Sequence, residues 1–487
     1  MSVAESPYEA VIGLEIHVQL ATRTKMFCGC ELSFGDPPNT HTCPVCLAHP
    51  GALPVTNREA IRLAIIAGMA LGCGVAERST FHRKNYFYPD LPKAYQISQY
   101  DEPICTEGRF RYLVEDGERE LGITRVHLEE DAAKLVHAGA GGRRAGAEGS
   151  VVDFNRGGTP LVEIVTEPEL TNAADAVAFL KQLRQTLREL GISDVNMEEG
   201  SLRADANVSI RPRGATELGT KAELKNMNSF RFLERGIEAE IARQTAVVES
   251  GERVVQETLH FDPATGEIHP LRSKEEAHDY RYFPEPDLLP VVPDRAWVEE
   301  LRAGLPELPV DRRRRWMDEL GLTYEDAEVL SESIPLGRYF EAVAALADPK
   351  TAANWVRGEL RAQLRAVDQE PWESKVTPER LAELIGLLER REISLPAAKE
   401  VLAEVIASGA APADVVADKG LGQIQDESEL IALVDRLLAE NAAQAEQLRG
   451  GRDKVVGFFV GQAMKATGGR ADPARVGELV RERATAA

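Results

Sequence analysis

The chain has 487 residues, of which 43% are hydrophobic and 28% are charged, and its formal net charge is −22. This length allows about two to four domains, each with its own core. The acidic excess excludes a general polyanion binder, because neutralising phosphates requires clustered lysine and arginine, although a local basic patch remains compatible with nucleic acid. Six cysteines in a chain of this size are not a disulfide scaffold.

The chain shows no sequence feature of export or membrane insertion. The N-terminal stretch MSVAESPYE lacks a basic segment followed by an apolar one, so we expect no secretory signal. The most apolar stretch, IRLAIIAGMALGCGV, contains Arg62 and is too short to cross a bilayer, which predicts a buried helix. We therefore expect a cytoplasmic protein with no membrane contact.

Residues 8–292 combine short strands with three helices. Alternating or β-branched stretches such as EAVIGLEIHVQL, GITRVHL, SVVDFN, PLVEIVTE and ANVSIRP predict strands. Helices are predicted over residues 57–71, 173–190 and 229–250, each ending before a glycine. The strands come in groups rather than in strict alternation with helices, which favours an α+β fold with a mainly antiparallel sheet. The glycine-rich stretch KLVHAGAGGRRAGAEGSVVDFN predicts a long hairpin with a flexible tip.

Two breaks divide the chain further. Prolines are dense over residues 284–309, and the sequence after them has an almost wholly helical pattern. The stretch ASGAAPAD makes a second break near residues 408–414. We therefore predict a mixed domain over residues 1–294, a helical domain over 295–410 and a C-terminal helical domain over 411–487.

Two close pairs of cysteines lie within CGCELSFGDPPNTHTCPVC. The pairs are Cys28 with Cys30 and Cys43 with Cys46, on turn-rich sequence. This spacing indicates a tetrahedral zinc site with four thiolate ligands, an iron–sulfur cluster or a redox pair being the alternatives. A closed four-thiolate site leaves no open coordination position, so we expect it to hold a loop rather than to catalyse a reaction.

Polar side chains recur at every second position in four predicted strands. Alternate side chains of a strand share one face, so Glu15 would lie beside His17, and His127 beside Glu129 and Asp131. One such strand is equally well explained as a solvated strand end. Four such strands together predict that charged side chains cover one face of a sheet, called here the charged floor. The positions concerned are Glu15, His17, Glu129, Glu130, Asp131, Glu163, Arg203, Asp205 and Asn207.

Such a floor would be unstable unless cations or shifted pKa values neutralised it. Oxygen ligands with an occasional histidine suit Mg²⁺ or Mn²⁺, and Mg²⁺ is commonly bound together with the phosphates of a nucleotide. The sequence has neither a G-x-x-x-x-G-K-[ST] nor a G-x-G-x-x-G motif, so basic side chains would have to bind the phosphates. The candidates are Arg156, Arg203, Lys221 and Lys225.

Aromatic and basic stretches suggest two further surfaces. FHRKNYFYPDLPKAYQISQ and DYRYFPEPD mix aromatic residues with too many charges for a dry core, which favours a substrate cleft or an interface. From Arg449 onward eight basic residues face four acidic ones, as expected of a module that contacts nucleic acid, and DRRRRWMDEL is a second basic cluster. A solvated helix face is the alternative for both basic clusters.

Seven of these stretches, in chain order, resemble the B subunit of the tRNA-dependent amidotransferases. They are VIGLEIHVQL, RKNYFYPDLPKAYQISQ, HLEEDAAK, DFNRGGTPLVEIVTEPE, MEEGSLRADANVS, KAELKNMNSF and DYRYFPEPDLLP, and GFFVGQAMKATGGRADP resembles the family's C-terminal tail. The resemblance implies a glutamine-synthetase-like catalytic cradle followed by a helical domain and a tail that contacts tRNA. It also implies an ATP-dependent carbon–nitrogen ligase with glutamine as amido donor, with an amidase partner (the A subunit) and a small C subunit.

The implied reaction has two steps. ATP with Mg²⁺ phosphorylates the side-chain carboxylate of Glu-tRNA(Gln) or Asp-tRNA(Asn), and ammonia then displaces phosphate. The activation is needed because an ionised carboxylate has no good leaving group, whereas an acyl phosphate has one. The chain itself shows no glutaminase centre, since its clustered cysteines are better explained by zinc, so ammonia would come from the partner.

The family's site residues carry over position by position. The resemblance implies Mg²⁺ ligands at Glu15, His17, Glu129, Glu130, Glu163 and Asp205. We assign catalytic roles to Glu129, Glu130, Arg203 and Asp205, and tRNA binding to Arg449, Arg452, Lys454, Lys465 and Arg470. The resemblance implies an ammonia route along Lys84, Tyr86 and Lys93. The zinc cysteines occur in only part of the family, so they are not essential to the chemistry.

Three points stay open at this level. A tRNA-binding scaffold without its own catalysis and a free-standing carboxylate–amine ligase are the alternative functions. The sequence does not say whether Glu-tRNA(Gln), Asp-tRNA(Asn) or both are used. Strand alternation favours Glu129 over Glu130 as the metal ligand, but a β-bulge would reverse that assignment.

Overall fold

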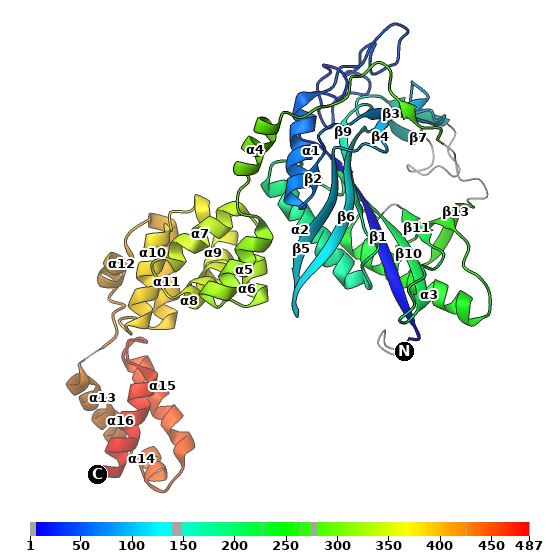
Figure 1. The fold of residues 1–487 in the computed structure, drawn as a ribbon. Helices are drawn as coiled ribbons and strands as arrows, with labels where there is room; N and C mark the ends of the chain where they lie inside the picture. The colour runs from blue at the N-terminus through cyan, green and yellow to red at the C-terminus, as the bar shows by residue number, and fades with distance from the viewer. Residues whose placement is uncertain are drawn as a thin grey trace. The chain divides into compact units, whose positions relative to one another are not determined.

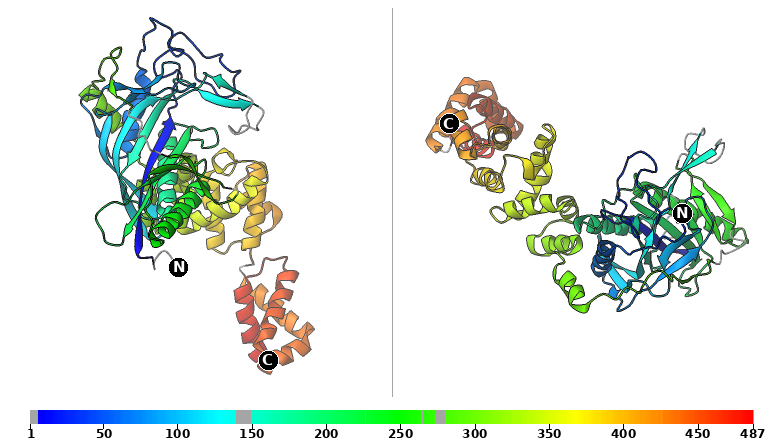
Figure 2. Two further views of the ribbon diagram at one scale, coloured as in Figure 1. Left: turned by 90° about the vertical axis from the view of Figure 1, so that its right-hand side faces the viewer. Right: turned by 90° about the horizontal axis from the view of Figure 1, so that it is seen from above.

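The computed structural model describes residues 6–138, 149–225, 227–263, 265–273, 280–424 and 426–486. The chain forms two compact units, Met1–Asp311 and Arg312–Ala487, shown in Figures 1 and 2. None of the helices in these described ranges is both long and apolar enough to cross a membrane. The tip of the predicted glycine-rich hairpin lies outside the described residues, while its arms β7 (Lys134–Ala138) and β8 (Gly149–Asp153) pair antiparallel.

A nine-stranded sheet forms the centre of the first unit (Figure 1). All neighbouring strands pair antiparallel except β11 and β12, which are parallel. The predicted α+β class with a mainly antiparallel sheet is therefore confirmed. In sheet order the strands are β13 (Ile268–Ser273), β12 (Glu257–Phe261), β11 (Ala222–Lys225), β10 (Leu202–Pro212), β1 (Tyr8–Gln19), β9 (Pro160–Thr166), β6 (Gly117–Glu130), β5 (Cys105–Val114) and β2 (Gly74–Val75).

The three predicted helices are present and contribute to the core of the same unit. They are α1 (Arg58–Ala70), α2 (Ala173–Glu189) and α3 (Phe230–Glu249), and each begins after a side-chain cap, Asn57, Asn172 and Ser229 respectively. The even-numbered side chains of β1, from Ile12 to Val18, are buried in the core to which these helices contribute. The odd-numbered side chains, including Glu15 and His17, therefore lie on the opposite face of the sheet.

A smaller sheet brings together two of the stretches predicted to form a cleft. It consists of β14 (Phe283–Pro284), β3 (Phe81–Asn85) and β4 (Tyr95–Gln99). Both guanidinium contacts from Arg83 to the buried carboxylate of Glu285 are 2.7 Å long and fasten β14 to β3. β4 packs against β6, so this sheet lies beside the end of the large one.

The second unit is helical and has two separate hydrophobic clusters, over residues 316–421 and 430–484. α4 (Arg295–Ala303) belongs to the first unit and packs against α1, so the first unit extends beyond the predicted boundary at residue 294. The three-domain division as predicted stays a prediction. The remaining α-helices are α5 (Pro309–Leu320), α6 (Tyr324–Leu330), α7 (Ile334–Ala344), α8 (Pro349–Asn354), α9 (Arg361–Arg365), α10 (Pro378–Glu389), α11 (Leu395–Ser408), α12 (Pro412–Lys419), α13 (Glu427–Glu440), α14 (Ala442–Arg449), α15 (Val456–Ala466) and α16 (Pro473–Ala486).

Part of the arginine run in α5 is buried or paired within the helical unit. Arg312 and Arg313 are buried, and Nε of Arg313 donates to Oγ of Ser331 over 2.5 Å. Nη2 of Arg315 lies 2.6 Å from Oε1 of Glu341. Arg312 and Arg313 therefore contribute to the packing of the helical unit, so the run is not a fully solvated face. The side chain of Arg314 is 53% exposed, and contact of this cluster with nucleic acid stays a prediction.

Candidate metal and nucleotide site

The strand register places the predicted polar positions in one row. His17 of β1 lies opposite Arg203 of β10 on one side and opposite Glu163 of β9 on the other, and Glu163 lies opposite His127 of β6. Directly paired residues point to the same face of a sheet, so four adjacent strands direct these side chains to one place. The structure thus confirms that the alternating positions share a face.

Two histidines and two carboxylates form the centre of this row. Nε2 of His17 lies 3.3 Å from Oε2 of Glu163 and 3.7 Å from Oε1 of Glu129. Nε2 of His127 lies 3.4 Å from Oε2 of Glu163 and 3.9 Å from Oε2 of Glu129. One ligand atom each from His17, Glu129 and Glu163 lie within 4.8 Å of one another, which suits an Mg²⁺ or Mn²⁺ ion with further ligands from substrate or water.

The surroundings of this group set its charges. Burial lowers the pKa of His127, and Nε of Arg125 donates to its Nδ1, which leaves the proton on Nε2 facing the carboxylates. Burial alone would lower the pKa of His17, but the neighbouring Glu163 and Glu129 raise it overall. Burial works against ionisation of Glu163, yet His127, His17 and Lys84 hold its pKa below the ordinary range. The site therefore keeps the carboxylate of Glu163 ionised, as a ligand for a cation must be.

Glu15 and Asp205 form the next row of the same face, where they lie opposite each other in β1 and β10. Nδ2 of Asn207 donates to Oε1 of Glu15 over 2.9 Å, and Nζ of Lys225 lies 3.0 Å from Oδ2 of Asp205. Asp205 and Lys225 line a cavity of about 290 Å³ that also has His17, Glu129 and Arg203 in its wall, called here the acidic cavity. Among the predicted phosphate ligands, Lys221 is exposed and Arg156 lines a different cavity, so neither lines this one.

Glu129 and Glu130 point to opposite sides of β6. Glu129 accepts a hydrogen bond from Oγ of Ser98 and lines the acidic cavity. Glu130 is paired with the ammonium group of Lys93 and accepts from the backbone N–H of Ile97 over 3.0 Å. The described pairing of β6 with β9 has no bulge at this end, so alternation holds and Glu130 is not brought to the other predicted metal ligands.

Lys84 and Tyr86 line the acidic cavity, whereas Lys93 lies on the other side of β6 with Glu130. The ammonium group of Lys84 lies 5.1 Å from the ring centroid of Tyr280, which is close enough for a cation–π contact. Burial disfavours its charge, but Glu129 and Tyr282 outweigh that effect and raise the pKa of Lys84. Lys84 is thus a fixed cation beside the carboxylates.

Asp131 ends the acidic run and is bound by arginines rather than by histidines. Its carboxylate lies 3.1 Å from Nη2 of Arg203 and 3.8 Å from Nε of Arg156. Burial alone would raise the pKa of Asp131, but the two guanidinium groups hold it below its usual range. The sequence placed both Asp131 and His127 on the shared face, but it assigned no role to either residue.

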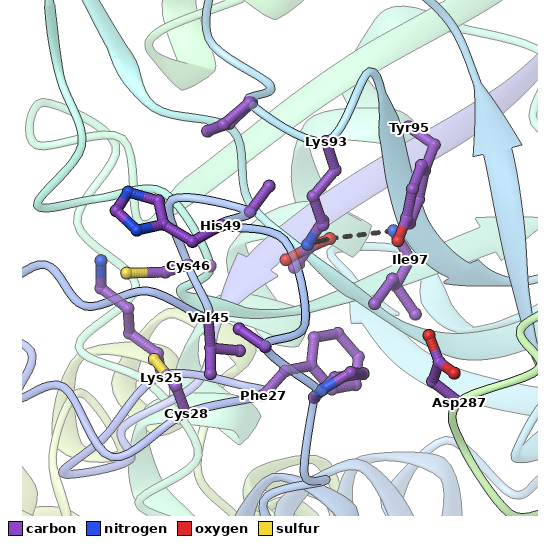
Figure 3. Close-up of a pocket in the computed structure, with 16 residues that line it drawn as sticks. Lys25, Phe27, Cys28, Val45, Cys46, His49, Lys93, Tyr95, Ile97 and Asp287 are labelled. Carbon is purple, nitrogen blue, oxygen red and sulfur yellow. Dashed lines mark hydrogen bonds and ion pairs between the residues drawn. The ribbon is translucent and has the colours of Figure 1, made fainter.

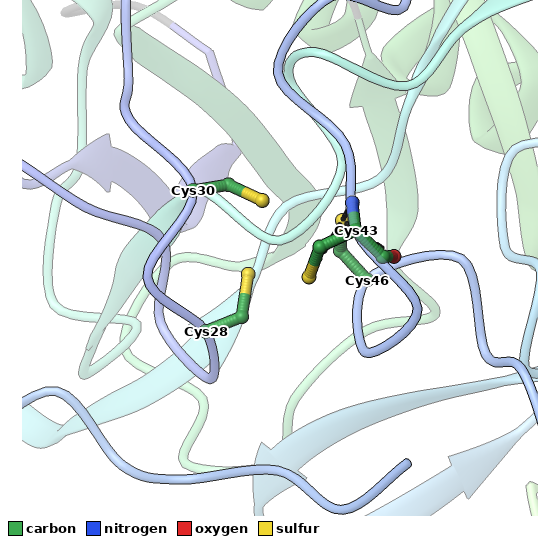
Figure 4. A group of neighbouring side chains, drawn as sticks. All are labelled: Cys28, Cys30, Cys43 and Cys46. Atoms are coloured by element: carbon green, nitrogen blue, oxygen red, sulfur yellow. Dashed lines mark hydrogen bonds between the residues drawn. The ribbon is translucent and has the colours of Figure 1, made fainter.

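The four clustered cysteines come from two facing loops (Figure 4). The Sγ atoms of Cys43 and Cys46 are 3.9 Å apart, and all four sulfurs lie within 4.8 Å of one another. A tetrahedral zinc site with Zn–S bonds of about 2.3 Å places its sulfurs about 3.8 Å apart. A hydrogen bond from Cys28 lowers the pKa of Cys46 to about 4, so a thiolate is available at neutral pH. The residues therefore fit a zinc ion.

The cysteine loop also walls a second cavity, of about 260 Å³, shown in Figure 3 and called here the loop cavity. Cys28 and Cys46 lie on one side of it, and Lys93 and Tyr95 lie on another (Figure 3). Glu130 lines the same cavity. The acidic cavity and the loop cavity therefore lie on the two sides of the end of β6, with Glu129 in one and Glu130 in the other.

The five basic residues predicted to bind tRNA are exposed in the second unit. Nε of Arg449 donates to the carbonyl of Ala484, and Nε of Arg470 donates to that of Thr467. In the part of the chain that the structure describes, no carboxylate pairs with Lys454 or Lys465. Three other arginines of the tail are neutralised by carboxylates, in the pairs Arg475–Glu427, Arg481–Asp453 and Arg483–Asp435.

Comparisons with known proteins match both units of the chain. Residues 10–299 match the family described as the GatB/GatE catalytic domain, and residues 338–483 match the one described as the GatB domain. The site residues of the acidic cavity all lie within the first match.

Relatives of similar length are named as the B subunit of aspartyl/glutamyl-tRNA(Asn/Gln) amidotransferase. One from Geotalea daltonii is 54% identical over 474 residues, covering 97% of this chain and 98% of the relative. Others from Moorella thermoacetica and Anaeromyxobacter sp. strain Fw109-5 are 52% and 51% identical, and each comparison covers 98% of this chain and 99% of the relative. The chain therefore belongs to the GatB/GatE family, as a relative of the amidotransferase B subunits.

Proposed function

We propose that this chain is the ATP-dependent catalytic B subunit of a tRNA-dependent amidotransferase. It would phosphorylate the side-chain carboxylate of Glu-tRNA(Gln), Asp-tRNA(Asn) or both, and ammonia would then replace the phosphate to give the amide. The observation that carries this proposal is the convergence of His17, Glu163, His127 and Glu129 from three adjacent strands on one buried group. A glutamine-synthetase-like cradle for the first unit is part of the proposal.

The residues of the acidic cavity suit phosphoryl transfer. Magnesium held by His17, Glu129 and Glu163, with Glu15 and Asp205 beside them, would neutralise charge on the transferred phosphoryl group. Arg203 and Lys225 present cationic donors to the same cavity and would bind phosphate oxygens. Lys84 adds a fixed positive charge that reduces repulsion between the carboxylates and an anionic substrate.

The remaining assignments rest on the family resemblance and on the chain's own residues. We assign glutamine as the amido donor, with the ammonia produced by the amidase (the A subunit) and with the small C subunit in the complex. Lys93, Lys84 and Tyr86 would line the route of ammonia, and zinc would be held by the four clustered cysteines. The exposed Arg449, Arg452, Lys454, Lys465 and Arg470 would contact tRNA.

The test is amide formation by the purified complex of all three proteins. We expect Glu-tRNA(Gln) or Asp-tRNA(Asn) to be converted to the amide form only when ATP, Mg²⁺ and glutamine are all present. Glu163→Gln should reduce the rate by at least about 100-fold, because it removes a charged ligand from the centre of the group. A complex that amidates at an unchanged rate with Glu163→Gln would refute the catalytic assignment and favour a scaffold role.

A further inference from the structure

Asp131 lines the acidic cavity, and its carboxylate is anchored by several hydrogen bonds. Its side chain is 4% exposed. Its backbone is fixed by two hydrogen bonds, both 2.8 Å long, from its N–H to the carbonyl of Thr159 and from the N–H of Gly158 to its carbonyl. Nε2 of Gln19 donates to Oδ2 over 2.7 Å, and the backbone N–H of Ala132 donates to Oδ1 over 2.9 Å. These contacts fix both oxygens before any ligand binds.

Asp131 is not placed as a metal ligand. Its Oδ1 also accepts from Nη2 of Arg203 over 3.1 Å, and its Oδ2 lies 3.8 Å from Nε of Arg156. Two cations therefore balance one buried carboxylate, and both oxygens already have partners. This differs from Glu129 and Glu163, whose oxygens face histidines at the centre of the site.

Arg203 extends from this anchor into the acidic cavity. Its side chain is 38% exposed, and it lines the cavity together with His17 and Asp205. Among the described residues, its buried Nε has no hydrogen-bond partner, which is costly for a charged donor unless a ligand supplies one. Asp131 holds the guanidinium group through Nη2 alone, and a guanidinium group fixed in this way with donors to spare is suited to an anionic oxygen such as that of a phosphate.

We propose that Asp131 is a positioning residue that orients Arg203 for binding a nucleotide phosphate in the acidic cavity. Arg156 is held by the same carboxylate and donates to the carbonyls of Ala132 and Ala133 over 2.9 and 3.0 Å, so it fixes the turn on which Asp131 lies. Asp131 therefore acts through Arg203 and does not touch the substrate. This inference rests on the proposed function, because that function supplies the nucleotide.

The test is the dependence of amidation on ATP concentration in the complete complex with Asp131→Asn. We expect the KM for ATP to rise about tenfold while kcat changes less than about threefold, because Arg203 loses its anchor and binds phosphate less well. Asp131→Glu keeps the charge that balances the two arginines, so it should fold as the wild type does. The longer side chain of the glutamate displaces Arg203, so the KM of Asp131→Glu for ATP should lie between the wild-type value and that of Asp131→Asn.

The matched control is Glu9→Gln. Glu9 of β1 accepts from Nε of Arg211 over 2.7 Å, and Arg211 lies on β10, the strand that also carries Arg203, but away from the cavity. The KM of the Glu9→Gln variant for ATP should stay within about twofold of the wild-type value.

A double-mutant cycle provides a second test. The effects of Asp131→Asn and Arg203→Lys on the KM for ATP should not be additive, because Asp131 acts through Arg203.

Three outcomes are distinguishable. A tenfold KM effect that is absent from Glu9→Gln supports the inference. An Asp131→Asn enzyme that matches Glu9→Gln, or one in which only kcat or thermal stability falls, overturns it and leaves the proposed function standing. A wild-type complex without tRNA- and ATP-dependent amidation overturns the proposed function itself.

Discussion

Glu129, Glu130 and Asp131 are consecutive, yet their carboxylates have three different partners. Glu129 faces His17 and His127, Glu130 is paired with Lys93 on the other side of β6, and Asp131 is held by arginines where the strand ends. Strand alternation separates the first two, and the turn after β6 separates the third. Substitutions at adjacent positions should therefore have different effects.

The first prediction concerns divalent metal binding, measured by titration of the complex with Mn²⁺. Glu129→Gln should weaken Mn²⁺ binding at least tenfold, because it removes one of three clustered ligand groups. Glu130→Gln is the matched control and should leave the affinity within about twofold. Equal loss in both variants would place both carboxylates at the metal.

The second prediction concerns the same two variants in equilibrium unfolding. Glu130→Gln should lower the free energy of unfolding by about 3 kcal/mol, because it leaves the ammonium group of Lys93, whose side chain is only 13% exposed, without its counter-charge. Glu129→Gln should have a smaller cost, because it relieves repulsion among neighbouring carboxylates. A smaller loss of stability in Glu130→Gln than in Glu129→Gln would contradict this assignment.

Residue patterns could predict the row of polar side chains but not all of their partners. The alternation of Glu15 with His17 and of His127 with Glu129 follows from strand geometry alone, so the shared face was predictable. The pairing of Glu130 with Lys93 depends on how β4 and the loop before it pack on β6, which no local pattern encodes. The role of Asp131 depends on a turn after β6 and on Arg156, so it was missed.

At the scale of elements, the cysteine loop joins two parts of the first unit. It brings together Cys28 and Cys30 with Cys43 and Cys46, and it forms one wall of the loop cavity that contains Lys93. Without a metal, four clustered thiols must share protons and repel one another when ionised, so the proposed zinc ion would stabilise the loop. Loss of zinc should therefore affect the order of this wall before it affects the sheet.

The third prediction is that Cys43→Ser removes zinc and lowers the melting temperature. Metal content measured by mass spectrometry should fall from about one zinc per chain to near zero, because three thiolates bind zinc more weakly than four. Cys73→Ala is the control, since Cys73 is buried outside the cluster and should keep full zinc. Equal zinc in the wild type and Cys43→Ser would refute a four-thiolate site.

At the scale of the whole chain, the periodicity of apolar residues and the glycines and capping residues at element ends were enough to predict the fold class but not every boundary. Glycines and caps marked α1, α2 and α3, and the grouping of strands predicted an antiparallel sheet. α4 falls within the first unit because it packs on α1, a contact between distant segments that composition does not reveal. The burial of Arg312 and Arg313 in α5 is likewise a feature that composition does not reveal.

The fourth prediction concerns the basic residues of the tail. Replacing Arg452, Lys454 and Lys465 together by glutamine should weaken tRNA binding at least tenfold and reduce its salt dependence, because these exposed cations would release counterions from tRNA. Arg483→Gln is the control, since its guanidinium is already bound to Asp435. Equal effects of the control and the triple variant would place the tRNA surface elsewhere.

The central claim is that the acidic cavity transfers a phosphoryl group to the carboxylate of a misacylated tRNA. The most direct test is ADP formation from ATP in a single turnover by the complex with Glu-tRNA(Gln) or Asp-tRNA(Asn), in the absence of glutamine and ammonia, because the phosphoryl group then stays on the carboxylate. We predict a burst that requires the misacylated tRNA, is lost in Glu163→Gln and is kept in Glu167→Gln, whose carboxylate accepts from Thr124 beyond the end of β9. A burst of equal size without tRNA, or an undiminished one in Glu163→Gln, would contradict the account.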